Sequence, residues 1–136
     1  MGRWRDGRAK LVVHADGHGG SGYGEGAEGS AVTVPLELAT SFRARTRGLL
    51  GRDGIDGAIL LSPASSIHTF RMRFAIDVAY LDRKLNVLNV HTVKPGRLTL
   101  PRLRARHVLE SDAGTMAGWG LRPGARVTVE ESTRLS

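Results

Sequence analysis

The chain has 136 residues, a length typical of one domain with a single hydrophobic core. Its hydrophobic content of 40% and charged content of 24% are those of an ordinary globular protein, and it contains no cysteine. The composition therefore excludes disulfides, thiolate metal sites and cysteine nucleophiles, and the lack of a long apolar run excludes a membrane-spanning helix.

Positive charge is concentrated in one part of the chain. The net charge is +7, and residues 57–109 carry nine Lys or Arg but only two acids, Asp77 and Asp82. The excess in this segment equals the net charge of the whole chain. It indicates either binding to a polyanion or an arginine-rich surface that is simply solvated.

The first two strands are predicted on either side of a glycine-rich loop. Residues 8–14 centre on three aliphatic side chains, and residues 31–38 alternate with four aliphatic side chains on one face. Between them, residues 14–30 contain seven glycines and little that is apolar, which predicts a mobile loop. The flanking strands are expected to pair as a hairpin, with Pro35 at an edge or a bulge because proline lacks an amide donor.

A helix is predicted next. Thr40 or Ser41 is suited to cap its N-terminus, and Gly51 is suited to end it after about Leu50. Arg47, in its last turn, either complements the helix dipole or reaches inward to a carboxylate. The inward stripe is predicted to consist of Phe42, Thr46, Leu49 and Leu50.

The stretch 67–82 is the centre of the predicted fold. Its second half alternates like a half-buried strand, with four bulky apolar side chains on one face and Asp77 between Ala75 and Ala79 on the other. Small neighbours of a carboxylate leave either a shallow hollow or room for a closely packed helix. Residues 58–61 are predicted to form a short strand that is buried on both faces, and residues 85–93 to form the hairpin partner.

The remaining elements are short. Residues 97–106 mix three leucines with four arginines, and are predicted to be an exposed strand edge or an extended crossing segment. A strand at 107–110, a helix at 111–120 and a strand at 126–130 follow, and two glycines in the helix predict a closely passing backbone. Six to eight short strands and two short helices predict one α+β, mainly β domain over residues 1–136, its antiparallel sheet curled into a partial small barrel.

Four motifs in this order carry a family resemblance. The helix reads RARTRGLLGRDG and the strand after it GAILLSP; an IHTF-x-MRF-x-ID pattern then ends at Asp77, and the tail reads HVLESDAGTMAGWGLRPGARVTVE. Together they resemble the domain of unknown function 192 (DUF192) family over about residues 32–130, in a branch with the IHTF pattern. The resemblance implies a small, mostly β domain and supplies no activity. Some branch members place a cysteine near position 64, where this chain has Ala64, so a thiol-dependent role does not carry over.

We expect a small binding or accessory domain whose polar site, around His68 and Asp77, holds a small polar ligand or a protein partner. The alternative is structural: Asp77 accepts hydrogen bonds from backbone amides or pairs with an arginine, His68 is a satisfied hydrogen-bonding residue, and Trp119 closes the core. The candidate ligand-binding residues are His68, Thr69, Arg73, Asp77, Arg47 and Trp119.

Two other functions are weighed against binding. In a hydrolase-like enzyme, His68 and Asp77 would form an acid–base pair, with Arg71 or Arg73 stabilising an anionic group. No nucleophile elbow, phosphate loop or dinucleotide motif supports catalysis. Nucleic-acid binding through residues 57–109 is the other function, but aromatic residues for base stacking are missing among the arginines.

The sequence shows no pattern typical of a metal site, a cofactor site or a signal peptide. His14 and His18 are four residues apart, a spacing that means little in a glycine-rich loop, so we expect no metal and no cofactor. The start of the chain reaches an apolar run of only three residues, too short for a signal peptide. We therefore expect a cytoplasmic protein with no membrane partner.

Overall fold

The computed structural model describes residues 4–14 and 31–131, so the predicted mobile loop lies, apart from His14, outside the described residues. Neither helix of this part of the chain is long and apolar enough to cross a bilayer. The elements are β1 (Gly7–His14), β2 (Ala31–Ala39), α1 (Phe42–Arg47), β3 (Ala58–Leu61), β4 (Ile76–Leu81), β5 (Val87–Val93), β6 (His107–Asp112), α2 (Thr115–Trp119) and β7 (Arg126–Glu131).

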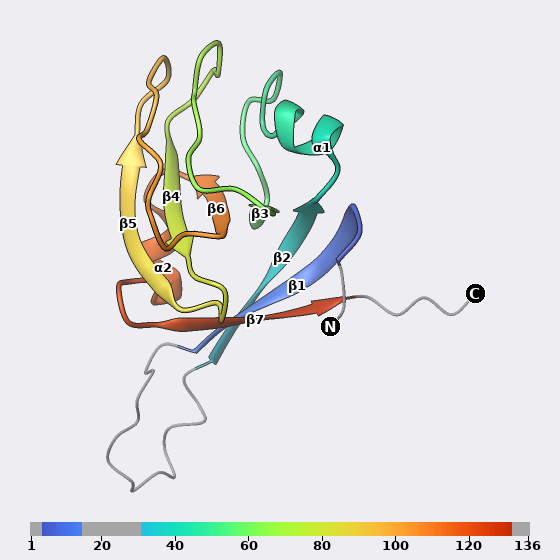
Figure 1. The fold of residues 1–136 in the computed structure, drawn as a ribbon, viewed down its shortest axis with the longest axis vertical. Coiled ribbons are helices and arrows are strands. Elements are labelled where there is room, and N and C mark those ends of the chain that lie inside the picture. The colour runs from blue at the N-terminus through green and yellow to red at the C-terminus, as the bar shows by residue number, and fades with distance from the viewer. Residues whose placement is uncertain (1–3, 15–30, 132–136) are drawn as a thin grey trace, which may run out of the picture.

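The strands form one curled sheet in the order β5-β4-β6-β3-β2-β1-β7 (Figure 1). All neighbours are antiparallel except β2 and β3, which are parallel because α1 and the loop after it carry the chain back along the sheet. At one end the two outer strands meet, where the amide of Val87 donates to the carbonyl of Ala125 at 2.8 Å. The mainly β, partial-barrel prediction is confirmed, and the parallel pair makes the sheet a mixed one.

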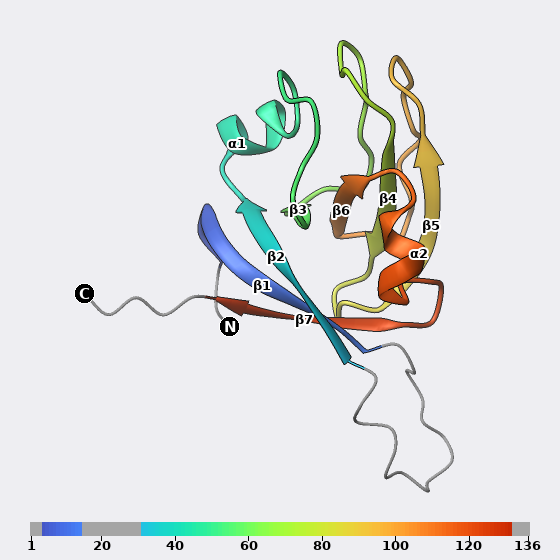
Figure 2. The ribbon, with the colours of Figure 1, turned by 180° about the vertical axis from the view of Figure 1, so that it is seen from behind.

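Both faces of the sheet are covered. The concave face buries a cluster that includes Leu11, Leu81 and Val127, together with Met116 of α2; Figure 2 shows α2 against β4 and β6. The second face buries another cluster, to which Tyr80 contributes from β4 and to which residues 64–72 and 105 add apolar side chains. The predicted alternation of β4 is therefore correct, but the strand is buried on both faces rather than half-buried.

Helix α1 is shorter and more exposed than its sequence predicts. Ser41 caps it as expected, since its hydroxyl accepts a hydrogen bond from the amide of Ala44 at 3.0 Å. The helix ends at Gly48, whose φ of +46° favours glycine, and not at Gly51. Phe42 is 76% exposed and Thr46 is exposed as well, whereas Leu49 is buried, so the predicted inward stripe is wrong at its first two residues.

Helix α2 begins later than predicted because β6 continues through Asp112. A Cβ built at Gly114 or Gly118 would meet nothing within 4 Å, so the predicted close backbone contact is absent at these two glycines. Such a contact occurs at Gly57, where a Cβ would lie 2.1 Å from the carbonyl oxygen of Pro35. Pro35 itself lies in an interior strand, but pairing with β3 begins only at Leu36, so proline is tolerated there.

Candidate ligand-binding site

Asp77 is buried on the concave face, where its carboxylate is fully occupied. It is 4% exposed, and one oxygen accepts a hydrogen bond from the Thr92 hydroxyl at 2.7 Å. The other oxygen accepts from the backbone amides of Gly114 at 2.9 Å and Met116 at 3.1 Å. The carboxylate thus fastens the start of α2 to β4, which is the arrangement expected for the structural alternative.

Glu110, on the neighbouring strand, is buried to the same degree on the opposite face. It lies across from Val78, whose side chain points away from the Asp77 side, and it is 4% exposed. Among the described residues, its carboxyl has neither a hydrogen-bond partner nor an ion-pair partner. Desolvation by burial raises the pKa of this carboxyl to about 7.

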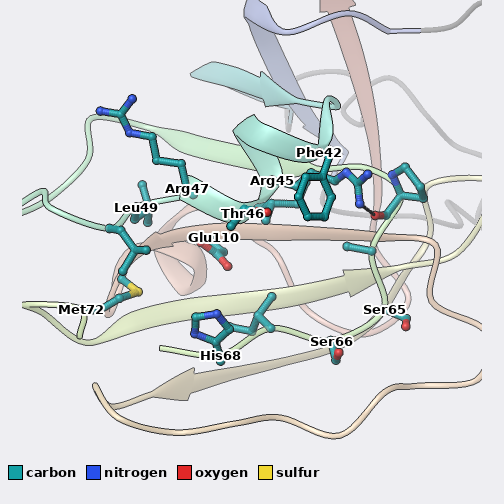
Figure 3. A pocket seen from close by; sticks show the side chains of 16 residues that line it. Phe42, Arg45, Thr46, Arg47, Leu49, Ser65, Ser66, His68, Met72 and Glu110 are labelled. Carbon is teal, nitrogen blue, oxygen red and sulfur yellow. Dashed lines mark hydrogen bonds between the residues drawn. The ribbon is translucent and has the colours of Figure 1, made fainter. Parts of the chain in front are cut away.

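Glu110 faces a pocket of about 370 Å³ between α1 and the segment after β3. Figure 3 shows its carboxylate projecting into the space between α1 and the residues Ser66 and His68. The apolar part of the lining includes Phe42, Leu49 and Met72. This volume is at the lower end of the range for small-molecule sites. The pocket can therefore hold a small ligand with a polar group directed at Glu110.

The rim of the pocket is cationic and polar. Arg45 donates to the carbonyl oxygens of Thr40 and Pro63, each at 3.4 Å, and is held at the edge by them. Arg47 also lines the pocket, but its guanidinium points away from Glu110 (Figure 3). His68 is exposed at the opposite side, with its ring stacked on that of Phe70 at 5.0 Å. A ligand that reaches Glu110 must pass these groups.

The structure separates the six sequence-based candidates. His68 and Arg47 line the pocket, whereas Asp77 and Trp119 lie on the concave side, where Trp119 packs against the core cluster. The proposed partners His68 and Asp77 are therefore not brought together.

The last two candidates have contacts of their own. Thr69 is completely buried, and its hydroxyl donates to the carbonyl of Lys94 and accepts from the amide of Arg97. Arg73 pairs with the exposed Asp53 at 3.1 Å. Thr69 therefore fixes the turn between β5 and the segment that follows it.

A serine–histidine contact occurs elsewhere in the sheet. The hydroxyl of Ser62 lies 2.8 Å from Nδ1 of His107. Because Leu61 pairs with Val108, Ser62 and His107 occupy the next position of the β3–β6 ladder. Burial and the neighbouring Arg106 lower the pKa of His107, so the ring is neutral at pH 7 and suited to this hydrogen bond. The geometry is that of a cross-strand pair that extends the ladder.

Sequence reasoning missed Glu110, although two signals were present. The residue is an acid that directly follows the apolar pair Val108 and Leu109 in the predicted strand, and it falls within the motif on which the family resemblance rests. What could not be read from the sequence is the absence of a partner, since that depends on what α1 and residues 64–72 bring to the same place.

A curled mixed sheet, with a pocket on one face into which the Glu110 carboxyl projects, defines a small, mainly β domain. The model of the DUF192 family, described as "Uncharacterized ACR", matches residues 25–129. The chain therefore belongs to this family, and the resemblance noted from its motifs is confirmed.

The chain is similar to a curated relative in sequence and to two solved structures in fold. A UPF0127 protein of Pyrococcus horikoshii is 34% identical over 84 residues, which cover 58% of this chain and 73% of that protein. A crystal structure of a candidate transcription regulator from Sinorhizobium meliloti 1021 has a TM-score of 0.73 at 18% identity and covers 94% of this chain and 98% of its own. A protein of unknown function from Novosphingobium aromaticivorans has a TM-score of 0.68 at 20% identity, covering 88% and 83%. At these identities the two structures show the shared fold alone.

Proposed function

We propose that the protein is a binding domain that holds a small ligand in the Glu110 pocket, through a hydroxyl or amino group that donates a hydrogen bond to the Glu110 carboxyl. The observation that carries this proposal is a largely buried carboxyl that opens into a pocket and has no hydrogen-bond or ion-pair partner among the described residues. Buried polar groups in proteins are hydrogen-bonded almost without exception, because an unmet one costs free energy of folding. An unpaired carboxyl that opens into a pocket is accounted for if a ligand supplies the missing donor.

The rest of the lining supports a small ligand of mixed character. Met72 and Leu49 offer apolar contact beside the carboxyl, while Ser65 and Ser66 offer hydroxyl groups. Arg45 and His68 at the rim favour an additional acceptor or anionic group on the ligand. The expected site around His68 is thus retained, with Glu110 in the place that the sequence assigned to Asp77.

A fragment screen by ligand-observed NMR tests the proposal. At pH 8, where the Glu110 carboxyl is mainly ionised, hydroxyl- and amine-bearing fragments are expected to bind the wild type. Binding is expected to weaken about tenfold or more in Glu110→Gln, since a hydrogen bond to a charged group is worth about 1.5–3 kcal/mol. The matched control is Glu130→Gln, the same change at an exposed strand position. Ser66→Phe fills the rim of the pocket without touching the carboxyl and is expected to abolish binding.

The pKa of Glu110 provides a second measurement, by NMR titration of its carboxyl carbon. An amine ligand is expected to lower this pKa from about 7, because a nearby cation favours the ionised form. Fragments that bind wild type and Glu110→Gln equally well, or that leave the titration of Glu110 unchanged, would contradict the proposal.

A further inference from the structure

Two segments lie side by side over the second face of the sheet, and we call residues 64–73 and 94–106 the covering ribbon. They run antiparallel and are joined by backbone hydrogen bonds, among them Thr99 to Ile67 at 2.9 Å and Thr69 to Arg97 at 2.8 Å. The guanidinium of Arg102 lies 4.7 Å from the centre of the Tyr80 ring beneath it. The ribbon is therefore a fixed layer, and many of its side chains are exposed to solvent.

The covering ribbon carries most of the exposed large apolar side chains of the described residues. Among the described residues, five large hydrophobic side chains are exposed, and four of them belong to the covering ribbon. These are Phe70 at 47%, Leu98 at 65%, Leu100 at 78% and Leu103 at 92% exposed. Single exposed leucines are common, but a group of this kind on one layer marks an interaction surface.

The same ribbon is strongly cationic. It contains Arg71, Arg73, Lys94, Arg97, Arg102, Arg104 and Arg106, and no Asp or Glu. All seven cations are exposed. Within residues 4–14 and 31–131, Arg73 is the one of them that forms an ion pair, with Asp53. In the run from Arg97 to Arg104, arginines and leucines are interleaved. A partner must therefore offer anionic groups and an apolar layer at nearly the same place.

We propose that the covering ribbon docks on the surface of an anionic lipid bilayer. Phosphate headgroups meet the arginines, and the leucines enter the boundary between headgroups and acyl chains, as in other interfacial membrane-binding segments. A nucleic acid would offer phosphates to the arginines but would leave the leucines in water. Base stacking would also need a free aromatic ring, and Phe70, the aromatic residue of the ribbon, is already stacked on His68. This attachment needs no membrane-spanning element, but it departs from the sequence-based expectation of no membrane partner. Residues 64–68 and Met72 of the ribbon also line the Glu110 pocket, so the docked face borders that pocket.

Vesicle flotation of the full chain tests the proposal at physiological salt. Binding is expected to vesicles of phosphatidylcholine with a minor share of phosphatidylglycerol, and to be much weaker with phosphatidylcholine alone. The variant Leu98→Ser/Leu100→Ser/Leu103→Ser is expected to lower the partition coefficient about tenfold or more. The variant Arg97→Gln/Arg104→Gln is expected to lower it to a similar extent.

The matched control is Arg8→Gln/Arg126→Gln, which removes the same charge from exposed positions on β1 and β7. It is expected to bind within about twofold of wild type if the ribbon is the contact surface, since its arginines stay in water. Because the three leucines are exposed, thermal unfolding of their variant is expected to match wild type.

Three results would overturn the proposal. One is no flotation with the anionic vesicles. Another is flotation of the leucine variant equal to that of wild type, since the leucines would then make no contact with the bilayer. The surface would bind any polyanion through its arginines alone, and wild type and the leucine variant would be retained equally on heparin. The third is an equal loss in the Arg8/Arg126 control, which would make total charge the cause.

Discussion

Strands β4 and β6 carry two buried carboxyls on opposite faces of the same sheet, and the two have opposite surroundings. Asp77 accepts three hydrogen bonds, two of them from backbone amides at the start of α2. Glu110 is buried to the same 4% exposure, has no partner among the described residues and has its pKa raised to about 7. Burial alone therefore does not determine what a carboxyl does in the fold: the donors around Asp77 make it a tie between β4 and α2, whereas no donor in the described part of the chain gives Glu110 such a role.

The largest expected effect is at the satisfied carboxyl. Asp77→Ala leaves the Gly114 and Met116 amides and the Thr92 hydroxyl without their acceptor, and we expect a loss of about 4 kcal/mol in the free energy of unfolding. That loss corresponds to a Tm lower by about 10 °C or more for a domain of this size. Asp53→Ala, at an 85% exposed side chain, is the control and is expected to change little. A small loss at Asp77 would remove the contrast between the two carboxyls.

The unsatisfied carboxyl is expected to respond in the opposite direction. With a folded-state pKa of about 7 and an ordinary value of 4.5, Glu110 keeps its proton in the folded protein while the unfolded chain loses it. The free energy of unfolding therefore falls between pH 4.5 and pH 7, by up to about 3 kcal/mol, and is level above that range. Glu110→Gln removes this fall, so the variant is expected to be more stable than wild type at pH 8 and similar to it at pH 4.

Urea unfolding of wild type and Glu110→Gln at several pH values measures this effect. The difference between the two proteins isolates Glu110, because every other titrating group is common to both. Glu130→Gln is the control and is expected to keep the wild-type pH dependence. A constant difference across this pH range would mean that Glu110 ionises normally, and the argument for an unmet carboxyl would fail.

A smaller effect is expected when Asp77 loses one donor and keeps two. Thr92→Val removes the hydroxyl that lies 2.7 Å from the carboxylate, and we expect a loss of about 1 kcal/mol. Thr33→Val makes the same change on the exposed side of β2 and is expected to be neutral or slightly stabilising, since valine favours strands. Thermal unfolding of the two variants compares them directly.

The smallest effect concerns a carboxylate that is paired but still open to water. Glu37 forms two contacts of 2.8 Å with Arg52, which holds the pKa of Glu37 below its usual range. Since water screens side chains that are more than a third exposed, Arg52→Gln is expected to cost about 0.5 kcal/mol, and less in high salt. Arg73→Gln breaks the more exposed pair with Asp53 and is expected to have no measurable effect on urea unfolding.

The periodic features of the fold could be predicted from the sequence. Alternation identified the two faces of β4, and a short apolar run identified the buried strand β3. The pairing of β1 with β2 followed from their position on either side of the glycine-rich stretch. The position of Asp77 between small residues correctly allowed for a closely packed helix. Its donors lie 37 and 39 residues further along the chain, so their identity could not be derived locally.

The predictions that were wrong concern residues whose surroundings are set by segments distant in the sequence. Phe42 was expected to face inward, yet α1 has only six residues and stands at the edge of the pocket, where its first side chain remains in solvent. Ser111 was expected to begin a helix, but pairing of β6 with β4 through Asp112 keeps the chain extended. Asp77 and Glu110 differ in their contacts for the same reason, because a carboxyl's partners are set by tertiary packing.

Strand β1 lies between β2, its neighbour in the chain, and β7, the last strand of the described residues. The β1–β7 ladder joins Leu11 to Val129, so its formation closes a loop of more than a hundred residues, and contacts of such sequence separation form slowly. During synthesis on the ribosome, one side of β1 must therefore wait with free backbone groups until nearly all of the fold has emerged. We expect completion of this ladder to be the late step of folding, and a nascent chain halted before Arg126 to be prone to pairing β1 with a second molecule.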